Sequence, residues 1–281
     1  MHIAAIVVTY NPEEYLLRQQ KEVLLNEVDW IIYVDNGTQN TPLIDSLASE
    51  GVVIVRNIHN LGLAKAQNQG IAKARERGVD FIVMFDQDSI PPHGFIQGLM
   101  DCYESQRKNY KVALVGPVIK NLINESKGNS KGSIFKGLSI KFVEVNKATE
   151  VSYCIASGSL IPIKVIDDVG DMNEMMFIDG LDVEWCFRAT NKGYKIFQTN
   201  NTYLQHCLGD GTSRRVLSHS PKREYYIIRN AIWMSKQSYV PMGYRLRKAL
   251  LSSGRLILSL ASMRTGYIRA DLQGIIDGIK M

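Results

Sequence analysis

Uninterrupted apolar runs, rather than alternating apolar and polar residues, dominate the first part of the chain. Amphipathic patterns with helical spacing separate these runs, at 13–26, 63–77 and 94–107. Strands without polar alternation that are separated by helices are typical of a parallel sheet covered on both faces. We therefore predict an α/β fold with a mostly parallel, Rossmann-like central sheet and helices on both faces. Its strands are expected at Ile3–Thr9, Trp30–Val34, Val52–Arg56, Phe81–Phe85 and Val112–Val115.

The pattern changes in the second half of the chain. Residues 116–151 are rich in Gly, Ser, Lys and Asn, which predicts an irregular or hairpin insertion rather than a domain boundary. Pro221 suits the first position of a helix, and apolar residues recur at helical spacing from there to Ile279. We therefore predict a domain at 1–220 and a C-terminal helical region at 221–281. Between the insertion and Pro221, ordered structure is expected at 151–162, a helix at 179–192, and short strands at 195–199 and 202–206.

Composition excludes several classes of protein. With 281 residues, 45% of them hydrophobic, the chain can bury a substantial core and is not disordered. No apolar run approaches the roughly 18–20 residues that span a bilayer, and the N-terminus reads as a buried strand rather than a signal peptide. The cysteines are spread without a C-x-x-C pair, which predicts neither a zinc site nor a disulfide framework and favours a reducing cytosol.

The formal charge of +5 is concentrated at one end. Residues 241–281 contain seven Lys or Arg and two Asp, so the rest of the chain is neutral overall and is not a general nucleic-acid binder. This segment is also amphipathic, with apolar residues among the arginines. Two interpretations remain open: the helices bind an anionic membrane surface, or their apolar stripe packs on the domain at 1–220 or on a second subunit. The stripe comprises Leu246, Leu250, Ile257, Leu260, Ile268 and Ile275.

Polar clusters follow each of the first four predicted strands, at 9–11, 35–37, 57–60 and 86–88. Ligands of open parallel sheets bind beyond the carboxyl ends of the strands, although turns are also polar for structural reasons. There is no G-x-G-x-x-G after the first strand and no Gly-Lys dipeptide, which disfavours a dinucleotide fold and a P-loop. Asp35 could accept a hydrogen bond from a ribose hydroxyl or a base imide.

Two acidic clusters are candidates for chemistry. Asp86-x-Asp88 follows a fully apolar strand, and hard divalent cations prefer carboxylate oxygens; capping of the next helix is the structural alternative. Asp179, Asp182 and Glu184 lie at the start of a predicted helix, where Asp179 and Asp182 would share a face. Apolar neighbours would bury these acids, and burial tunes a carboxylate for general-base catalysis; ordinary charge at a helix N-terminus is the alternative.

A basic, aromatic stretch follows the predicted strand that ends at His206. Guanidinium groups match the oxygens of a diphosphate, but charge alone equally fits a solvated helix face. The candidate residues are Arg214, Arg215, Arg223, Tyr226 and Arg229.

With these residues in place, the sequence resembles family 2 glycosyltransferases with the GT-A fold, and within them the bacterial rhamnosyltransferases of surface-polysaccharide assembly. The resemblance covers residues 3–235, and the order and spacing of its motifs carry it. These are Val7-Val8-Thr9-Tyr10-Asn11, Val34-Asp35-Asn36-Gly37, Asn60-Leu61-Gly62 with Asn68-x-Gly70, Phe85-Asp86-Gln87-Asp88-Ser89, Ser157-Gly158-Ser159-Leu160-Ile161-Pro162, the Phe-Ile-Asp-x-x-Asp-x-Glu-Trp-Cys block at 177–186 and Tyr-Tyr-x-x-Arg-Asn at 225–230.

The resemblance implies a role for each matching position. The domain at 1–220 would comprise a nucleotide-binding half at 1–115 and an acceptor-binding half at 116–220. Asp182 is the implied base, with Asp179 as a rival because Leu181 stands where the family usually has a second acid. The implied metal is Mg²⁺ or Mn²⁺, on Asp86, Asp88 and His206. Implied nucleotide contacts are Thr9, Asn11, Asp35, Asn36, Asn60 and Asp86; implied acceptor or diphosphate contacts are Ser157, Gly158, Glu184, Trp185, Arg214, Arg223, Tyr226 and Arg229.

The reaction that the resemblance implies is inverting sugar transfer from a nucleotide-diphosphate sugar, with dTDP-β-L-rhamnose as the expected donor. The acceptor would be a saccharide or polyprenyl-linked saccharide, which places the protein in the cytoplasm at the inner face of the plasma membrane. Donor alternatives are UDP-galactofuranose, a UDP-hexose and a UDP-N-acetylhexosamine. A sugar nucleotidyltransferase and a non-catalytic glycan-binding protein are alternatives of other classes, but the first strand lacks the Gly-rich basic loop of the former.

Overall fold

A central sheet of mostly parallel strands organises the protein. The computed structural model describes residues 1–121, 131–206 and 219–281. Four neighbouring strands form the parallel half of the sheet, in the order β3-β2-β1-β4, and their registers bring Thr9 beside Asp35 and Val8 beside Asp86. The polar residues that follow these strands therefore meet at one edge, as predicted. These strands are β1 (Ile3–Thr9), β2 (Trp30–Asp35), β3 (Val52–Arg56) and β4 (Phe81–Asp86).

The second half of the sheet continues from β4 through a short antiparallel strand. β10 (Leu160–Pro162) pairs antiparallel with β4 and with β6 (Val112–Asn121), so β6 runs in the direction of β4. β11 (Lys195–His206) is parallel to β6, and β5 (Ser89–Ile90) and β9 (Thr149–Val151) pair antiparallel with β11.

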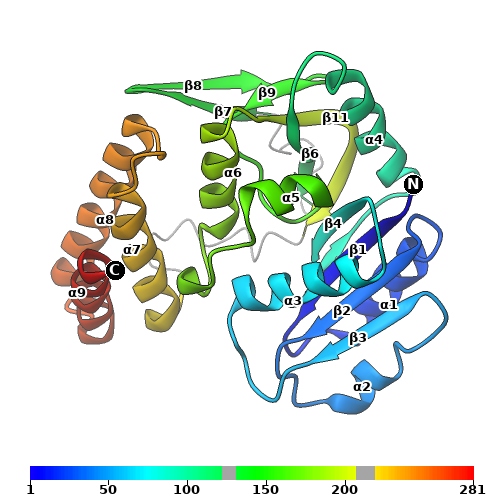
Figure 1. Ribbon diagram of the computed structural model, residues 1–281. Coiled ribbons are helices and arrows are strands. Elements are labelled where there is room, and N and C mark those ends of the chain that lie inside the picture. The colour runs from blue at the N-terminus through cyan, green and yellow to red at the C-terminus, as the bar shows by residue number, and fades with distance from the viewer. Residues whose placement is uncertain (122–130, 207–218) are drawn as a thin grey trace.

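Helices cover both faces of the sheet (Figure 1), which confirms the predicted class. One face packs Leu17, Ile44 and Phe95, and these residues belong to α1 (Glu14–Leu24), α2 (Thr41–Asp45) and α4 (Phe95–Gln106). The other face packs Ile71, Val165 and Trp185, from α3 (Leu63–Glu76), α5 (Ile163–Val169) and α6 (Leu181–Asn191). Alternate residues of the buried strands supply the two cores, which is why the strands read as continuous apolar runs.

The insertion contains a hairpin, one of its two expected forms, made of β7 (Lys131–Lys136) and β8 (Ser139–Glu144). Two later elements differ from the expected ones. The two strands expected at 195–206 are one strand, β11, whose register against β6 shifts between Thr199 and Tyr203. Such a bulge leaves extra residues unpaired without ending the strand. The helix expected from Asp179 begins at Leu181, because Asp179 and Gly180 have positive φ values of 66° and 85°.

Three helices follow the central sheet: α7 (Pro221–Ser235), α8 (Met242–Ala261) and α9 (Thr265–Lys280). They lie side by side at one end of the molecule (Figure 1). Ser220 caps α7 by accepting a hydrogen bond from the Arg223 amide, and Pro221 occupies its first turn. α9 approaches the α7 backbone closely, since a Cβ on Gly278 would come within 2.6 Å of the Arg229 carbonyl oxygen. No helix in the described ranges is long and apolar enough to cross a bilayer.

Candidate active site

A cleft of about 870 Å³ opens at the carboxyl edge of the parallel strands. Its walls come from the ends of β1 and β4, the loop before β10, the loop that leads into α6, and the first turn of α7. Residues 1–115 and the later chain therefore share the cleft. Of the residues singled out in the sequence, the cleft is lined by Thr9, Asn36, Asn60, Asp86, Asp88, Ser157, Asp179, Asp182 and Arg223.

Asn36 organises the floor of the cleft. Its side-chain amide donates to Asn60 Oδ1 at 3.1 Å, and its Oδ1 accepts from the Leu61 amide at 2.9 Å. Asn60 Oδ1 in turn accepts from the amide of Gly62 at 2.9 Å. Gly62 has φ +92°, and a Cβ there would lie 2.6 Å from the Phe177 ring. These bonds hold the start of α3 against the end of β2, and the Leu63 amide, which donates to the Phe177 carbonyl at 2.6 Å, joins it to the loop that carries Asp179.

Asp35 and Asn11 stand just behind the cleft wall. Asp35 is buried, and its Oδ1 accepts from the Thr38 amide at 3.1 Å. Asn11 has φ +47°; its amide donates to Thr38 Oγ1, and its Oδ1 accepts from the Gln39 amide at 3.0 Å. Both residues shape the turn at the end of β2 in this structure, and neither lines the cleft itself.

The Asp86-Gln87-Asp88 turn is clamped from two sides. The side-chain amide of buried Gln20 donates to the carbonyl of Asp86 at 2.8 Å and to the carbonyl of Ser89 at 2.6 Å. From the other side, the Asp86 amide donates to Ser157 Oγ at 3.1 Å. The clamp places the carboxylates of Asp86 and Asp88 at the cleft. The sequence pattern did not identify Gln20 as a support of this turn, because a glutamine within a predicted helix is ordinary.

The oxygen donors of Asp86 and Asp88 suit a hard divalent cation such as Mg²⁺ or Mn²⁺. His206, the third expected ligand, ends β11, and its backbone pairs with Ser89 next to Asp88. The side chain of His206 lies outside the described part of the structure, as does Arg214. Within the described residues, no three His, Cys, Asp or Glu side chains form a cluster able to hold a metal.

Asp182 occupies the first turn of α6 and faces the cleft. Its Oδ1 accepts from the Val183 amide at 2.8 Å, and its Oδ2 accepts from the Ala156 amide at 3.3 Å. Burial raises the pKa of the Asp182 carboxyl, and the charge of Asp86 raises it further, while the two amides oppose the shift. A carboxylate with a raised pKa is a better proton acceptor, which suits a general base.

Asp179 is held differently from Asp182. Arg223 Nε donates to Asp179 Oδ2 at 3.0 Å and its Nη2 donates to Oδ1 at 2.9 Å, so the pair is bidentate. This pairing raises the pKa of Arg223. The side-chain amide of Asn230 donates to the carbonyls of Ile178 and Asp179 at 2.7 and 2.8 Å. Asp179 therefore positions the Arg223 guanidinium at the cleft wall. Of these two acids, Asp182 is the one that forms no ion pair with a described residue.

Tyr226 and Arg229 support the loop and do not line the cleft. Tyr226 stacks on Phe177 with ring centroids 4.7 Å apart. Arg229 lies over the Tyr226 ring at 4.8 Å and donates to the Met175 carbonyl at 2.5 Å. The structure thus gives both residues a bracing role in place of the expected direct contact.

Glu184 and Trp185 point into the protein, which corrects their expected role as acceptor or diphosphate contacts. Glu184 is 1% exposed, and its carboxylate accepts from Arg188 Nε and from the Tyr239 hydroxyl, each at 2.7 Å. Trp185 Nε1 donates to the Gly170 carbonyl at 2.8 Å. Of α6, only Leu181 and Asp182 line the cleft, and the helix turns the residues after Asp182 toward the interior. Gly158 also acts through its backbone: it has φ +80°, and its amide donates to the Met84 carbonyl at 2.6 Å.

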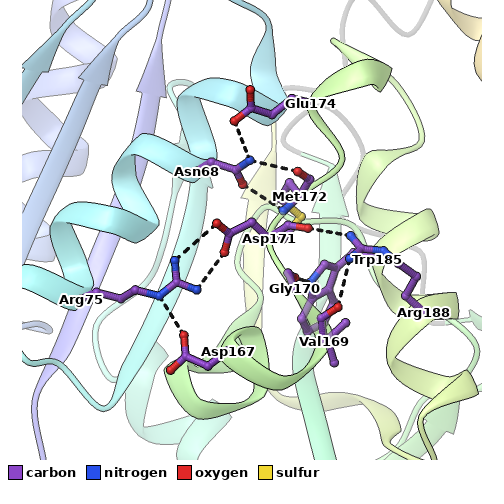
Figure 2. A network of polar contacts seen from close by, with 10 residues as sticks. All are labelled: Asn68, Arg75, Asp167, Val169, Gly170, Asp171, Met172, Glu174, Trp185 and Arg188. Carbon is purple, nitrogen blue, oxygen red and sulfur yellow. Dashed lines mark hydrogen bonds and ion pairs between the residues drawn. The ribbon is translucent and has the colours of Figure 1, made fainter.

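A polar network joins α3 to α6 and to the chain between α5 and α6 (Figure 2). Asn68 of α3 exchanges two hydrogen bonds with the backbone of Met172, each 2.9 Å long. Arg75 donates to Asp167 and Asp171, both at 2.8 Å. Arg188 Nη2 reaches the Asp171 carbonyl at 2.7 Å. The network therefore fixes the loop between α5 and α6 against α3, upstream of Asp179 and Asp182.

The cleft lining also includes polar residues to which the sequence analysis assigned no role, among them Tyr10, Gln87 and His219. The Tyr10 amide donates to Gln87 Oε1 at 2.7 Å, and the Gln87 side chain donates back to the Tyr10 carbonyl at 3.3 Å. Tyr10 is exposed, which leaves its ring free to contact a ligand. Tyr10 and Gln87 lie inside the motifs quoted above, and that position could have identified them as site residues.

Comparisons with known proteins agree with this geometry. The sequence profile described as "Glycosyl transferase family 2" matches residues 4–170. The dTDP-rhamnosyl transferase RfbF of Shigella flexneri is 32% identical over 99% of this chain and 96% of that protein. Among solved structures, S. aureus TarS 1–349 with UDP-GlcNAc has a TM-score of 0.63 at 15% identity, covering 98% of this chain and 82% of that one. GalNAc-T7 with UDP, GalNAc and Mn²⁺ has a TM-score of 0.61 at 12% identity, covering 89% of this chain and 54% of that one. The parallel sheet, the acidic cleft and the extent of these matches agree, and the chain belongs to glycosyltransferase family 2.

Proposed function

We propose that this glycosyltransferase transfers L-rhamnose from dTDP-β-L-rhamnose to a saccharide or polyprenyl-linked saccharide, with inversion at the anomeric carbon. The observation that carries the proposal is the match to a dTDP-rhamnosyl transferase along 99% of the chain, which spans the acidic cleft as well as the C-terminal helices. Other donors of the same family, such as UDP-galactofuranose, a UDP-hexose or a UDP-N-acetylhexosamine, are the alternatives.

Asp182 is the proposed general base. Its carboxylate would accept the proton of the acceptor hydroxyl while the oxygen bonds to the anomeric carbon. In the same displacement the bond from that carbon to the diphosphate oxygen breaks, and the electron pair leaves with the diphosphate. A single displacement needs no enzyme nucleophile, and it inverts the anomeric carbon. The raised pKa of Asp182 fits the acceptance of this proton.

The remaining cleft residues hold the donor in this proposal. Asp86 and Asp88 would bind Mg²⁺ or Mn²⁺, which neutralises the charge of the leaving diphosphate when bound. Arg223 offers a second cation at the cleft, oriented by Asp179. Thr9, Asn36 and Asn60 line the side near β1 and β2, where the nucleoside would lie.

The proposed place of action is the inner face of the plasma membrane, where a lipid-linked acceptor would be available. The exposed apolar residues of α8 support this proposal, since Leu250 is 75% exposed and Ile257 is 64% exposed. Exposed basic residues accompany them on α8 and α9, including Arg247 and Arg269. A basic, apolar helix face matches an anionic bilayer surface. A second copy of the chain, forming a homodimer through these helices, is the competing occupant of the same face.

The donor is tested by incubating the protein with Mn²⁺ and each nucleotide sugar in turn, with a lipid extract as the source of acceptor. We expect release of dTDP and a rhamnosylated product from dTDP-rhamnose. From the UDP sugars we expect neither UDP nor a glycosylated product. Asp182→Asn serves as the control that separates enzymatic transfer from spontaneous breakdown of the donor. Turnover of a UDP sugar in place of dTDP-rhamnose would overturn the donor assignment while leaving the family intact.

A further inference from the structure

A second cavity, of about 260 Å³, lies beside the cleft between α6, α7 and α8. Asp179, Gly180 and Asp182 line both hollows, so the two meet at the acidic loop. The donor side of the cleft lies toward β1 and β4, and the second cavity lies on the other side of Asp182, among the C-terminal helices. A group bound there would reach the proposed base from the side away from the Asp86–Asp88 turn.

Some polar groups of this cavity already make hydrogen bonds or ion pairs, and others make neither. Arg255 forms an ion pair with Glu224 at 2.5 Å, and the amide of Asn230 is used on loop carbonyls. In the described part of the chain, neither the Lys248 amine nor the Tyr244 hydroxyl makes a hydrogen bond or ion pair. Two hydrogen-bonding groups in this cavity are therefore available to a ligand.

Lys248 is partly buried, and its amine lies over the Tyr244 ring at 5.3 Å from the centroid. Burial lowers the pKa of Lys248, while the charges of Asp182 and Asp179 raise it. Tyr244 is itself packed edge-to-face against Phe135 and Phe187, which fixes its ring. A partly buried amine without a hydrogen-bond partner lowers stability, and the hydroxyls of a ligand would relieve that loss.

We propose that this cavity is the acceptor subsite: it takes one sugar ring, whose hydroxyls accept hydrogen bonds from Lys248 and Tyr244 while a neighbouring hydroxyl faces Asp182. The size limits the occupant to a small group such as one sugar ring, because 260 Å³ lies below the roughly 300–1,000 Å³ of pockets that hold larger, drug-sized ligands. A sugar ring also combines hydroxyls for the amine with an apolar face for the Tyr244 ring. The inference rests on the proposed transferase activity and adds α8 to the acceptor site.

The test separates acceptor binding from donor binding. Wild-type protein and Lys248→Met are given dTDP-rhamnose, Mn²⁺ and, as probes, the octyl glycosides of rhamnose, N-acetylglucosamine and galactose at millimolar concentration. Lys248→Met keeps the apolar stem and removes the amine. We expect the KM for the accepted glycoside to rise at least tenfold, as loss of a hydrogen bond from a charged group predicts. Slow hydrolysis of the donor by water, and the affinity for dTDP, should stay within twofold.

Two further variants sharpen the result. Lys164→Met makes the same change at an exposed lysine on α5 and should leave the acceptor KM unchanged. Tyr244→Phe removes only the hydroxyl and should raise the acceptor KM severalfold. An unchanged acceptor KM in Lys248→Met, an equal loss of donor hydrolysis, or a wild type that saturates with none of the three glycosides would overturn the subsite. A wild type that neither hydrolyses nor transfers from dTDP-rhamnose would instead overturn the proposed donor.

Discussion

At the scale of single residues, the two acids before and within the first turn of α6 have different partners. Asp179 forms a bidentate ion pair with Arg223, and Asp182 receives only backbone amides among the described residues. Arg223 occupies both oxygens of the Asp179 carboxylate, whereas burial raises the pKa of Asp182 and strengthens it as a base. The geometry therefore separates a positioning acid from a reacting one.

Asp182→Asn should lower the transfer rate by at least about a hundredfold while dTDP still binds, because the amide cannot accept the proton. The activity of the wild type should also fall on the acid side at a pH above the ordinary carboxyl pKa of about 4, because burial raises the pKa of Asp182. Both are measured by pH profiles of kcat with saturating donor. If Asp179→Asn is inactive and Asp182→Asn is nearly normal, Asp179 is the base.

Asp88→Ala should abolish transfer and make nucleotide affinity insensitive to EDTA, because a carboxylate oxygen is removed from the expected cation site. Calorimetry of dTDP binding with and without Mn²⁺ measures this, and thermal unfolding verifies that the variant is folded. Asp101→Ala, which changes an exposed acid on α4, is the matched control and should behave as wild type. Full activity of Asp88→Ala in EDTA would show that no cation acts at this turn.

At the scale of elements, the sequence was most informative where burial on both faces produced long apolar runs. The parallel strands from β1 to β4 match the predicted runs within a residue at each end. The start of α6 was misplaced because positive φ at Asp179 is a backbone property that composition does not reveal. Glu184 and Trp185 were assigned to the site because they lie close to Asp182 in the sequence. That assignment was wrong because neighbours on a helix point in different directions. Lys248 was missed because its partner elements are distant in sequence.

Asp271 on α9 predicts a measurable pH dependence of stability. It is 0% exposed, and neither carboxylate oxygen makes a hydrogen bond of good geometry within the described residues. Burial raises the pKa of Asp271, and nearby Glu224 adds to the shift. Its stabilising contribution is therefore present below the ordinary carboxyl pKa and is lost as pH rises through the raised value. Asp271→Asn should unfold a few degrees higher than wild type at pH 8, with a difference that shrinks toward pH 4.

The matched control for this measurement is Asp277→Asn on the same helix. Hydrogen bonds from Gln273 and Tyr225 lower the pKa of Asp277, so the sign reverses and this change should not raise the melting temperature. Melting curves of both variants between pH 4 and pH 8 decide the question. A melting temperature of Asp271→Asn at or below that of wild type at pH 8 would show that the buried carboxylate is compensated.

At the scale of the whole molecule, the C-terminal helices present an unusual distribution of side chains. α8 buries Ser252 and Ser259, while Leu246, Leu250 and Leu251 are exposed. Two serines of α8 thus face the helical bundle while several leucines face outward, unlike a helix whose apolar residues all pack on its own domain. Contiguous exposed apolar residues of this kind mark a surface that another partner covers.

We expect this surface to bind anionic vesicles in a salt-sensitive way. Arg245 donates to backbone carbonyls and Arg255 pairs with Glu224, so the exposed cations Arg247, Arg264 and Arg269 should supply the attraction. Salt screens exposed charges over about 8 Å at physiological ionic strength, whereas apolar insertion is insensitive to salt. Flotation with phosphatidylglycerol vesicles at low and high salt measures both contributions. Replacing those three arginines with Gln should lower binding at low salt to the level seen at high salt, and replacing Leu250 and Ile257 with Ser should weaken the binding that remains at high salt. A chain that sediments as a dimer and does not float at low salt would assign the apolar face to a second copy instead.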